Sequence, residues 1–369
     1  MTTVLPEKII LVAADVLRDF AAALLVAGRF AAEESARTAD SLVLSDLSGY
    51  ESHGVVRVLE YTSALRTGEL ISGAELTVQQ ESANTIAADG GQGLGQAQMP
   101  RFLDMLMKKT ADNGVVSGAL RNCGHVGRLG EWVEYIAGRG MAGFVFVNDN
   151  GTIAAVAPPG GRAGRTSTNP VAFGIPLSDG DAFTLDISTS ATALGKLRLT
   201  HLAGYPCADG LIQDAQGNPT NDTNVMYEEP KGSLLPMGGA ANGYKGFGLS
   251  MMVDCLVAGL SGGFTPPAPE DTPGLNNVLV TIWNPEKFCG VAHMRAEAEK
   301  YLDFVRATPP INPGHPVRIA GDGAKRTREI RRKNGIPFGE SVVAALTKRA
   351  RKFGVATPTV FKEIKIAED

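Results

Sequence analysis

The sequence predicts an α/β protein in which a core of alternating strands and helices is joined to a helical domain built from both ends of the chain. Apolar residues recur at helical spacing over residues 6–27, and a charged helical pattern occupies residues 324–353. From about residue 76 the pattern changes to short apolar runs separated by glycine, with helical stretches between several of them. Strands that alternate with helices are typical of an α/β core.

The expected elements follow in order along the chain. The opening helix ends at Gly28, a second helix covers about 31–47, and a third begins near Ser52. Strands are expected at LTVQQ, NTIAA, VVSGALRN, GFVFVN, VAFGIP, FTLDI and VLVTIWN. Later helices are expected at 97–112, 128–138, 246–260 and 293–306. We therefore expect a helical domain of residues 1–75 with 320–369, and an α/β region of residues 76–319.

The composition is that of a soluble globular protein without a nucleic-acid partner. Of 369 residues, 44% are hydrophobic and 20% are charged, the formal net charge is −4, and the pI is about 5.8. Glu7 and Asp15 interrupt the apolar start, which argues against a secretory signal, and no apolar run approaches the roughly 18 residues that cross a membrane. The 4 cysteines are scattered without a CxxC pair, which predicts reduced thiols in a cytoplasmic protein and no metal site.

The segment DLSGYESHGVVR, residues 46–57, combines an imidazole with a guanidinium. If Ser52 is the N-cap of the third helix, His53 lies in its first turn, and Arg57 and Tyr61 follow on the same face. Such a face suits a small organic acid, because Arg57 can bind a carboxylate through two hydrogen bonds while His53 exchanges a proton. The alternative is that His53 is a surface cap residue and Arg57 a solvated charge.

A second histidine, His125, lies in a turn between an expected strand and an expected helix, in the stretch VVSGALRNCGHVGRLGEWVEYIA. Turns at strand ends are where ligands collect in α/β proteins. The pattern by itself leaves both a functional and a structural His125 open. A Cys123–His125 nucleophile pair is a further alternative, although neighbours in sequence do not by themselves form a dyad.

The glycine-rich stretch NTIAADGGQGLGQAQ is superficially similar to a dinucleotide fingerprint. Its glycines are spaced G-x-G-x-G at 91–95 rather than G-x-G-x-x-G. The next strand ends in Arg121 and Asn122, where an acidic residue would be expected to bind a ribose. We therefore do not favour a conventional Rossmann site at this position.

The segment FTLDISTSATALGK, residues 183–196, is a better candidate for a cofactor site. A strand carries Asp186, Ser188 and Ser190 near its end, before a helix begins. Asp186 can accept hydrogen bonds from ribose hydroxyls, and the serine hydroxyls with the helix amides can bind phosphate.

A second candidate is ANGYKGFGLSMMVDCLVAGLSGG, residues 241–263. Tyr244, Lys245 and Gly246 come just before a nearly all-apolar helix, whose free amides and lysine suit a pyrophosphate. The alternative is that the glycines serve only packing and Lys245 is solvated. Asp254 is the lone charge inside that helix, and we expect a hydrogen-bonded structural acid rather than a catalyst.

The basic run KRTREIRRKNG at 325–335 is interrupted by the acidic Glu329 within a chain that is acidic overall. A solvated helix face is the favoured interpretation. Contact with a 2′-phosphate is the next alternative, and nucleic acid is the last.

Taken together, these segments resemble the malate/L-lactate dehydrogenase family, which includes sulfolactate, ureidoglycolate and 2,3-diketogulonate oxidoreductases and Δ1-piperideine-2-carboxylate reductase. The matching motifs run in order along nearly the whole chain: D-x-x-G-x-x-S-H-G-x-x-R at 46–57, DGGQGLGQ at 89–96, NCGHVG at 122–127, TSTNP at 166–170, LDISTS at 185–190 with Gly195-Lys196, GYKG at 243–246, and AGDG at 320–323 ahead of RRKNGI at 331–336. Within the family, GHVGRLGEW at 124–132 and GSLLP at 232–236 are most similar to the hydroxycarboxylate dehydrogenases, also described as hydroxyphenylpyruvate reductases.

The resemblance implies a non-Rossmann fold, a mixed sheet with surrounding helices, that binds NAD or NADP mainly through residues 115–319. Such proteins are usually homodimers. The resemblance also implies that His53 donates and accepts the proton, and that His125 lies in the active site as base or substrate ligand. Ser52, Arg57, Thr168 and Asn169 are expected to contact the substrate. The implied nucleotide contacts are Thr184, Leu185, Asp186, Ile187, Ser188, Thr189, Ser190, Tyr244, Lys245, Gly321, Asp322 and Gly323.

The resemblance leads us to expect reversible hydride transfer between NAD(P)H and a 2-oxo or 2-hydroxy acid, with NAD favoured over NADP. Several family members have arginine where this chain has Ser48, which puts small dicarboxylates and sulfonates in doubt as substrates. Reduction of a cyclic imino acid remains open as an alternative reaction. A catalytically silent module that binds a nucleotide or an acid is the alternative outside enzymes.

Overall fold

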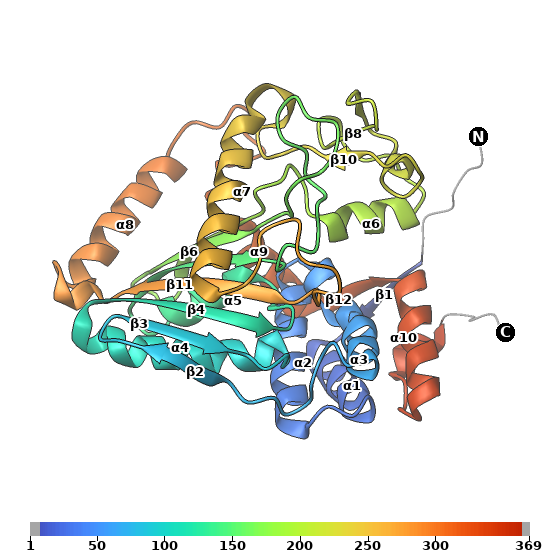
Figure 1. Cartoon of the computed structure of the whole chain (residues 1–369), viewed down its shortest axis with the longest axis horizontal. Coiled ribbons are helices and arrows are strands. Elements are labelled where there is room, and N and C mark those ends of the chain that lie inside the picture. Colours follow the sequence, from blue (N-terminus) through green and yellow to red (C-terminus); the bar gives the residue numbers. More distant parts are fainter. Residues whose placement is uncertain (1–7, 364–369) are drawn as a thin grey trace. The chain divides into compact units, whose positions relative to one another are not determined.

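A computed structural model describes residues 8–363, and the chain divides into two compact units. The first unit joins Met1–Ala74 to Asp322–Asp369, and the second comprises Glu75–Gly321. Each unit has its own sheet, and Figure 1 shows the second unit's sheet with helices on both of its faces. The α/β class that the sequence predicts is confirmed.

The helices of the first unit enclose a small antiparallel sheet of two strands, β1 (Ile9–Val12) and β12 (Ile336–Gly339). The helices are α1 (Ala14–Ala27), α2 (Ala32–Leu47), α3 (Val58–Thr67), α9 (Asp322–Asn334) and α10 (Glu340–Phe353). In their core, the rings of Phe20 and Phe361 meet edge to face with centroids 5.5 Å apart. A short 3₁₀ segment, η5 (Thr359–Glu363), carries Phe361.

Both strands of this sheet were expected to be helical, and that prediction is wrong. Ile10 and Val12 are buried while Ile9 and Leu11 are exposed, which is the alternation of a strand with one face on the core. The expected helix from residue 6 therefore begins at residue 14, and residues 6 and 7 lie outside the described part. Near the other end, Gly335 has a φ of +96°, and it separates α9 from β12 inside the expected 324–353 helix.

The third helix also begins later than expected. Two 3₁₀ turns, η1 (Glu51–His53) and η2 (Val55–Arg57), precede α3, and the extended residue Gly54 separates them. Ser52 is therefore inside η1 rather than the N-cap of a helix. Since Tyr61 is 2% exposed, it belongs to the core and does not share an open face with His53.

The second unit is built on a mixed seven-stranded sheet in the order β2-β3-β4-β11-β5-β6-β7. Its strands are β2 (Thr77–Glu81), β3 (Thr85–Asp89), β4 (Val115–Cys123), β5 (Ala142–Asn148), β6 (Val171–Pro176), β7 (Ala182–Ile187) and β11 (Asn276–Trp283). Only β3 and β4 pair in parallel. All seven expected strands are present, and each contains β-branched residues in a short stretch between turn formers.

Helices cover both faces of this sheet (Figure 1). One face packs against α4 (Gly95–Asn113) and α5 (Leu129–Ala137), with Trp132 fully buried between them and the strands. The other face packs against Val253 and Val257 of α7 (Gly239–Ser261). The helix α8 (Val291–Arg306) has a single buried residue, Leu302.

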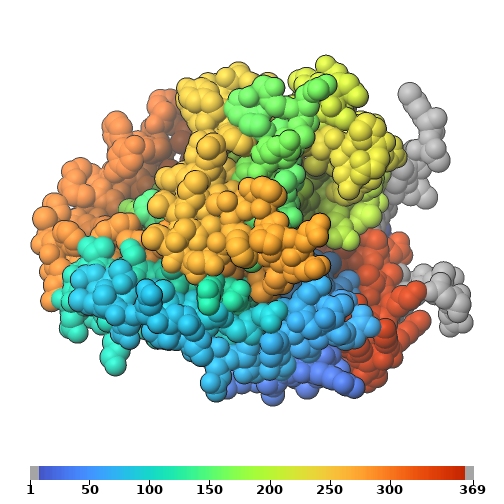
Figure 2. Space-filling model, viewed as in Figure 1, coloured from blue at the N-terminus to red at the C-terminus, as the bar shows by residue number. Residues whose placement is uncertain are grey.

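A small group of short elements, with a sheet of its own, follows β7 in the second unit. It contains α6 (Leu194–Leu202), a three-stranded sheet of β8 (Ile212–Gln213), β9 (Pro219–Thr220) and β10 (Ser233–Leu234), and the 3₁₀ segment η3 (Thr223–Met226). Another 3₁₀ segment, η4 (Pro285–Lys287), precedes α8. The proline-rich loop 264–274 lies on the surface, as expected, and is part of the orange surface in Figure 2. Among residues 8–363, no helix is both long and apolar enough to cross a membrane.

Candidate active site

One edge of the seven-stranded sheet gathers most of the expected site residues of the second unit. The strand register places the ends of β3, β4, β5 and β7 and the starts of β6 and β11 along this edge. Asp89 pairs with Arg121, and Cys123 pairs with Asn276. Val171 pairs with both Phe146 and Ile187. The turns that carry His125, Thr168-Asn169 and Ser188–Ser190 all leave from here. Ligands in α/β folds commonly bind where strands end in this way.

The turn before β6 is bonded directly to the segment after β7. The carbonyl oxygen of Thr168 accepts hydrogen bonds from the Thr189 N–H at 3.0 Å, the Thr189 hydroxyl at 2.9 Å and the Ser188 hydroxyl at 3.1 Å. The Ser190 hydroxyl lies 2.5 Å from that of Ser188 and donates to the Thr192 carbonyl at 2.7 Å. These hydroxyls, which we expected to bind phosphate, are thus engaged within the chain, while the expected helix after them is present as α6.

A buried polar network behind this turn contains Asp254 of α7. Asp254 Oδ2 accepts hydrogen bonds from the Thr166 hydroxyl at 2.6 Å and from Asn169 Nδ2 at 2.7 Å, and its Oδ1 accepts one from Asn148 Nδ2 at 3.1 Å. Asp254 is 5% exposed and Asn169 is 1% exposed. Asp254 therefore has the hydrogen bonds that we expected of a structural acid, and it holds Asn169 at the unusual φ of +30°.

Tyr244 and Lys245 lie inside α7 rather than before it, because the helix begins at Gly239 instead of residue 246. Both side chains are exposed, with Lys245 Nζ 5.8 Å from the Tyr244 ring centroid. A methyl group on Gly246 would lie 2.5 Å from the Met237 carbonyl oxygen, so a glycine is needed for this close packing. The Met237 N–H in turn donates to the Thr189 carbonyl at 2.9 Å. The structure thus brings the two expected cofactor segments side by side.

Asp186, the expected ribose acceptor, is tied to the start of α5. Its Oδ2 accepts a hydrogen bond from the Gly130 N–H at 2.8 Å. Burial raises the pKa of Asp186, while the neighbouring Arg128 lowers it. Arg128 has a 1% exposed side chain and pairs with Glu134 at 2.7 Å. One carboxylate oxygen of Asp186 is therefore occupied by a hydrogen bond within the protein, and the sequence pattern did not suggest this structural role.

The turn that carries His125 is supported by the glycine-rich loop before α4. The Gly124 N–H donates to the Gly93 carbonyl at 2.8 Å, and a methyl group on Gly95 would lie 2.3 Å from the Gly124 carbonyl oxygen. These glycines thus allow two backbones to approach each other, which explains their spacing without a dinucleotide. Cys123 is fully buried, and burial raises its pKa to about 12, so the alternative of a Cys123 thiolate nucleophile is not supported.

In the first unit, Ser52, His53 and Arg57 form one hydrogen-bonded group. The Ser52 hydroxyl lies 3.0 Å from His53 Nδ1, and Arg57 Nε donates to the Ser52 carbonyl at 2.7 Å. Arg57 Nη1 also pairs with Glu60 Oε2 at 2.6 Å, with side chains 22% and 57% exposed. The expected alternative of a merely solvated Arg57 is wrong, because its guanidinium braces the backbone on which His53 lies.

Part of the basic run in α9 contacts residues 46–51, just before this group, rather than solvent. Arg331 Nη1 donates to the Asp46 carbonyl at 2.5 Å, and its Nη2 pairs with Glu51 Oε1 at 2.5 Å. Arg328 Nε donates to the Ser48 hydroxyl at 3.2 Å. The favoured interpretation of a solvated face is therefore wrong for these two arginines. Since Arg328 brings a cation to Ser48, the lack of an arginine at residue 48 does not by itself exclude charged substrates.

The remaining expected nucleotide residues lie where the chain passes between the units. Gly321, with a φ of +91°, ends the second unit, and a methyl group there would lie 3.1 Å from the Thr184 carbonyl oxygen. Asp322 and Gly323 begin α9 in the first unit. Thr184 is buried beside Gly321. Ile187 packs against the apolar cluster that contains Val253 and Val257 of α7.

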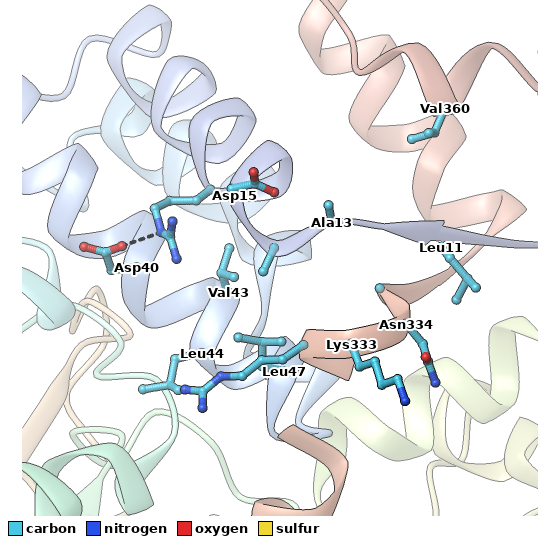
Figure 3. A pocket seen from close by; sticks show the side chains of 14 residues that line it. Leu11, Ala13, Asp15, Asp40, Val43, Leu44, Leu47, Lys333, Asn334 and Val360 are labelled. Carbon is cyan, nitrogen blue, oxygen red and sulfur yellow. Dashed lines mark ion pairs between the residues drawn. The ribbon is translucent and has the colours of Figure 1, made fainter. Parts of the chain in front are cut away.

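A cavity of about 810 Å³ lies in the first unit, beside β1, α2 and the end of α9 (Figure 3). Leu11, Val43 and Leu47 give it apolar walls, and Lys333 lies at its border. An Arg18–Asp40 ion pair of 2.7 Å also lines it. Neither His53 nor Arg57 borders this cavity, so it is distinct from the group of residues that we expected to act.

Asp149, at the end of β5, gives a testable pH effect. Burial, and then the charge of Asp254, raise the pKa of Asp149 to about 6. Because the unfolded chain releases this proton near pH 4, the folded state binds it more tightly, and stability should fall as the pH rises from about 4 to 6. Between these pH values the free energy of unfolding of the wild type should fall by roughly 1–3 kcal/mol through this carboxyl group. Asp149→Asn, which cannot titrate here, should not show this fall.

Urea unfolding at pH 4.5 and pH 7.0 measures this effect as the difference between wild type and variant at each pH. Asp112→Asn, on the exposed surface of α4, serves as the control and should leave the pH dependence unchanged. Equal pH dependence in wild type and Asp149→Asn would contradict the assignment of the raised pKa.

The comparisons with known proteins agree with this fold and these motifs. A model of the malate/L-lactate dehydrogenase family matches residues 12–347. Hydroxycarboxylate dehydrogenase B of Escherichia coli (strain K12) is 32% identical over 332 residues, which cover 89% of this chain and 90% of that protein. Malate dehydrogenase from Pyrococcus horikoshii OT3 superposes with a TM-score of 0.85 at 28% identity, covering 95% of this chain and 97% of the other.

Δ1-piperideine-2-carboxylate reductase from Pseudomonas syringae pvar. tomato superposes with a TM-score of 0.79 at 27% identity, covering 92% of this chain and 99% of the other. The fold and its matches are those of dehydrogenases and reductases that act on small organic acids. This chain belongs to the malate/L-lactate dehydrogenase family. Its membership supports an oxidoreductase that acts on 2-hydroxy acids.

Proposed function

We propose that the protein interconverts a 2-oxo acid and the corresponding 2-hydroxy acid with NAD, or alternatively NADP, as the redox partner. The observation that carries the proposal is the Ser52–His53–Arg57 group. Two hydrogen bonds, one between the Ser52 side chain and the imidazole and one from the guanidinium to the Ser52 carbonyl, hold these side chains on one short turn. When bound, the nicotinamide cofactor supplies hydride to C2 of the oxo acid or accepts it from C2 of the hydroxy acid. The chain's own residues bind the acid and move the proton.

His53 is the proposed proton donor and acceptor. Its Nδ1 lies 3.0 Å from the Ser52 hydroxyl, which can fix the ring so that the other nitrogen, Nε2, exchanges the proton with the substrate oxygen. An imidazole suits both directions, because it gains and loses a proton near neutral pH. His125 is proposed as a substrate ligand or as a second base, and it lies on the turn after β4.

Arg57 is proposed to hold the substrate carboxylate. Its Nη1 is paired with the exposed Glu60, and such exposed pairs are worth only about 0–1 kcal/mol, so a substrate carboxylate can displace Glu60. The braced Nε, bonded to the Ser52 carbonyl, keeps the guanidinium plane in place during this exchange. Ser52, Thr168 and Asn169 are proposed as further substrate contacts.

The proposed nucleotide site fits a dinucleotide by the chemistry of its donors. The N-terminus of α6 follows the Ser188–Ser190 segment and carries Lys196 in its first turn, and helix N-terminal amides with a lysine suit a phosphate. Lys245 and the exposed ring of Tyr244 lie on α7 next to Gly246, which packs on the Met237 that binds Thr189. They are proposed to bind a second phosphate and a flat ring. Residues 184–190, 244–245 and 321–323 are therefore proposed to hold NAD or NADP.

We propose that the protein is a cytoplasmic homodimer. Along the outer face of α7, Met251, Met252, Leu256 and Leu260 are 52%, 39%, 41% and 57% exposed, and a contiguous apolar stripe of this kind is typical of a surface that another chain covers. Sedimentation should give twice the mass of the chain, and Leu260→Glu should shift it toward the monomer. A wild-type monomer at micromolar concentration would contradict the dimer.

The decisive test is turnover of a panel of substrates with NADH and NADPH side by side. The panel should contain phenylpyruvate, pyruvate, oxaloacetate and Δ1-piperideine-2-carboxylate. We expect the highest kcat/KM with a 2-oxo acid and NADH. The structural similarity to Δ1-piperideine-2-carboxylate reductase makes imino-acid reduction the second candidate, and preferential turnover of that substrate would favour it. Absence of NADH and NADPH oxidation across the panel would favour a silent binding module.

Arg57→Lys tests the carboxylate role. Lysine keeps the charge but cannot form the planar pair of hydrogen bonds, so we expect KM for the acid to rise roughly 10-fold or more while kcat changes less. Steady-state kinetics with the best acid of the panel measure both constants. Glu60→Gln is the matched control, because it removes only the exposed partner of Arg57 and should leave KM unchanged or lower it. An unchanged KM in Arg57→Lys would mean that the carboxylate binds elsewhere.

A further inference from the structure

Asp46, near the end of α2, has a completely buried carboxyl group that faces the backbone of Gly54 and Val55. Its Oδ2 accepts a hydrogen bond from the Val55 N–H at 2.8 Å. A methyl group on Gly54 would lie 1.8 Å from Asp46 Oδ1 and 2.2 Å from Asp46 Cγ. Since the Gly54 φ of −89° is accessible to any residue, the closeness of the carboxyl group, and not the backbone conformation, requires glycine here.

This contact lies at the junction between the two turns that carry the proposed active residues. The turn η1 ends at His53, η2 begins at Val55 and ends at Arg57, and Gly54 joins them. The hydrogen bond from Arg57 Nε to the Ser52 carbonyl crosses the same junction. Any movement of Gly54 and Val55 would therefore change the orientation of both His53 and Arg57.

The Asp46 backbone is itself anchored. Arg331 donates to the Asp46 carbonyl and pairs with Glu51, so α9 ties the end of α2 to the start of η1. The carboxyl of Asp46 thus contacts the 51–57 segment directly, and its carbonyl is linked to the same segment through Arg331. This arrangement is more than space filling, because the carboxyl satisfies a buried N–H that has no helical partner at the start of η2.

We propose that Asp46 is a positioning residue, whose carboxyl holds the Gly54–Val55 junction and so sets the orientation of His53 and Arg57. The proposal rests on the proposed function, in which those two side chains transfer the proton and bind the acid. Burial raises the pKa of Asp46, which favours its neutral form. Asparagine, also neutral and of the same shape, is therefore the closest substitute and still offers an oxygen to the Val55 N–H.

The test compares Asp46→Asn with Asp46→Leu. Both side chains fill a similar space, but only asparagine can accept the hydrogen bond from Val55. We expect Asp46→Leu to lower kcat/KM for the 2-oxo acid roughly 10- to 100-fold, since misplacement of catalytic groups by about an ångström has effects of this size, and Asp46→Asn to stay within about 5-fold of wild type. The KM for NADH should change by less than about 2-fold in both, because neither variant alters the residues proposed to bind the nucleotide.

A purely space-filling role predicts equal kinetics for the two variants, and that outcome would overturn the proposal. If Asp46→Leu does not fold, as judged by circular dichroism, Gly54→Ala approaches the same junction from the other side. Its methyl group must displace the carboxyl, so we expect the same loss of kcat/KM in a folded protein. Gly314→Ala is the matched control, because its methyl group would meet only Asn312 Oδ1, at 3.5 Å. Wild-type kinetics of Gly54→Ala would also overturn the proposal.

The His53→Ala variant, assayed in parallel, separates this proposal from the function on which it rests. If His53→Ala is inactive while Asp46→Leu and Gly54→Ala are fully active, His53 keeps its role and only the positioning by Asp46 fails. If His53→Ala is fully active, the proton-transfer role proposed for His53, on which the positioning rests, itself fails.

Discussion

Replacing His53 by alanine should lower kcat roughly 10²- to 10⁴-fold, the range over which a positioned general acid or base contributes to catalysis. The loss is expected in both directions, because the same imidazole gives the proton during reduction and takes it during oxidation. The fold should be preserved, since His53 is only half-buried and the junction that follows it is held by Asp46 and Arg331.

The measurement is kcat for the best 2-oxo acid with NADH and for the corresponding hydroxy acid with NAD. His315→Ala, which removes an exposed imidazole of the second unit, is the matched control and should retain wild-type kcat. His125→Ala should be assayed in the same series, because His125 is the alternative base. A fully active, folded His53→Ala variant together with an inactive His125→Ala variant would transfer the proton role to His125.

The strands of the second unit could be predicted from the sequence, because their signal is local. Each is a short stretch that contains β-branched residues and lies between turn formers, and seven such stretches pair into the sheet. The 6–27 segment shows where this logic fails. Its apolar spacing also fits a helix over Ile9–Val12, and only pairing with the distant β12 makes these residues a strand.

Gly54 and Gly246 show why the site was harder to predict than the sheet. The sequence pattern placed one helix start near Ser52, as a possible N-cap, and another at residue 246, where an apolar run begins. In the structure, Gly54 makes room for the carboxyl of Asp46, and Gly246 makes room for Met237. Both neighbours are identified only after the chain has folded, because no feature of the local sequence shows which group will approach a glycine.

The side chains that serve the fold were also misjudged where their partners are distant in sequence. Asp186 binds the Gly130 N–H, 56 residues away, and Arg331 binds Glu51, 280 residues away. A pattern of hydroxyl or charged residues predicts that a segment is polar, but not whether its polar groups bind a ligand or another part of the chain. Asp254 was easier to interpret, because a single carboxylate in an apolar helix must be hydrogen-bonded to be tolerated.

Asp254→Ala should destabilise the second unit by roughly 3 kcal/mol, among the largest effects expected of a single substitution. The alanine would leave the Thr166 hydroxyl and the amides of Asn148 and Asn169 buried without this acceptor. Asn169 would also lose a contact that holds its φ at +30°. The free energy of unfolding from urea denaturation measures the effect, and Asp112→Ala on the exposed face of α4 is the control.

Because Asn169 adjoins Thr168, whose carbonyl binds Ser188 and Thr189, the same substitution should loosen the proposed nucleotide segment. We therefore expect the dissociation constant of NADH to rise in Asp254→Ala even at temperatures where the variant is fully folded. An unchanged free energy of unfolding would show that water or neighbouring groups replace the carboxylate. A destabilised variant with unchanged NADH affinity would show that the network supports the fold of α7 and the β6 turn without shaping the nucleotide site.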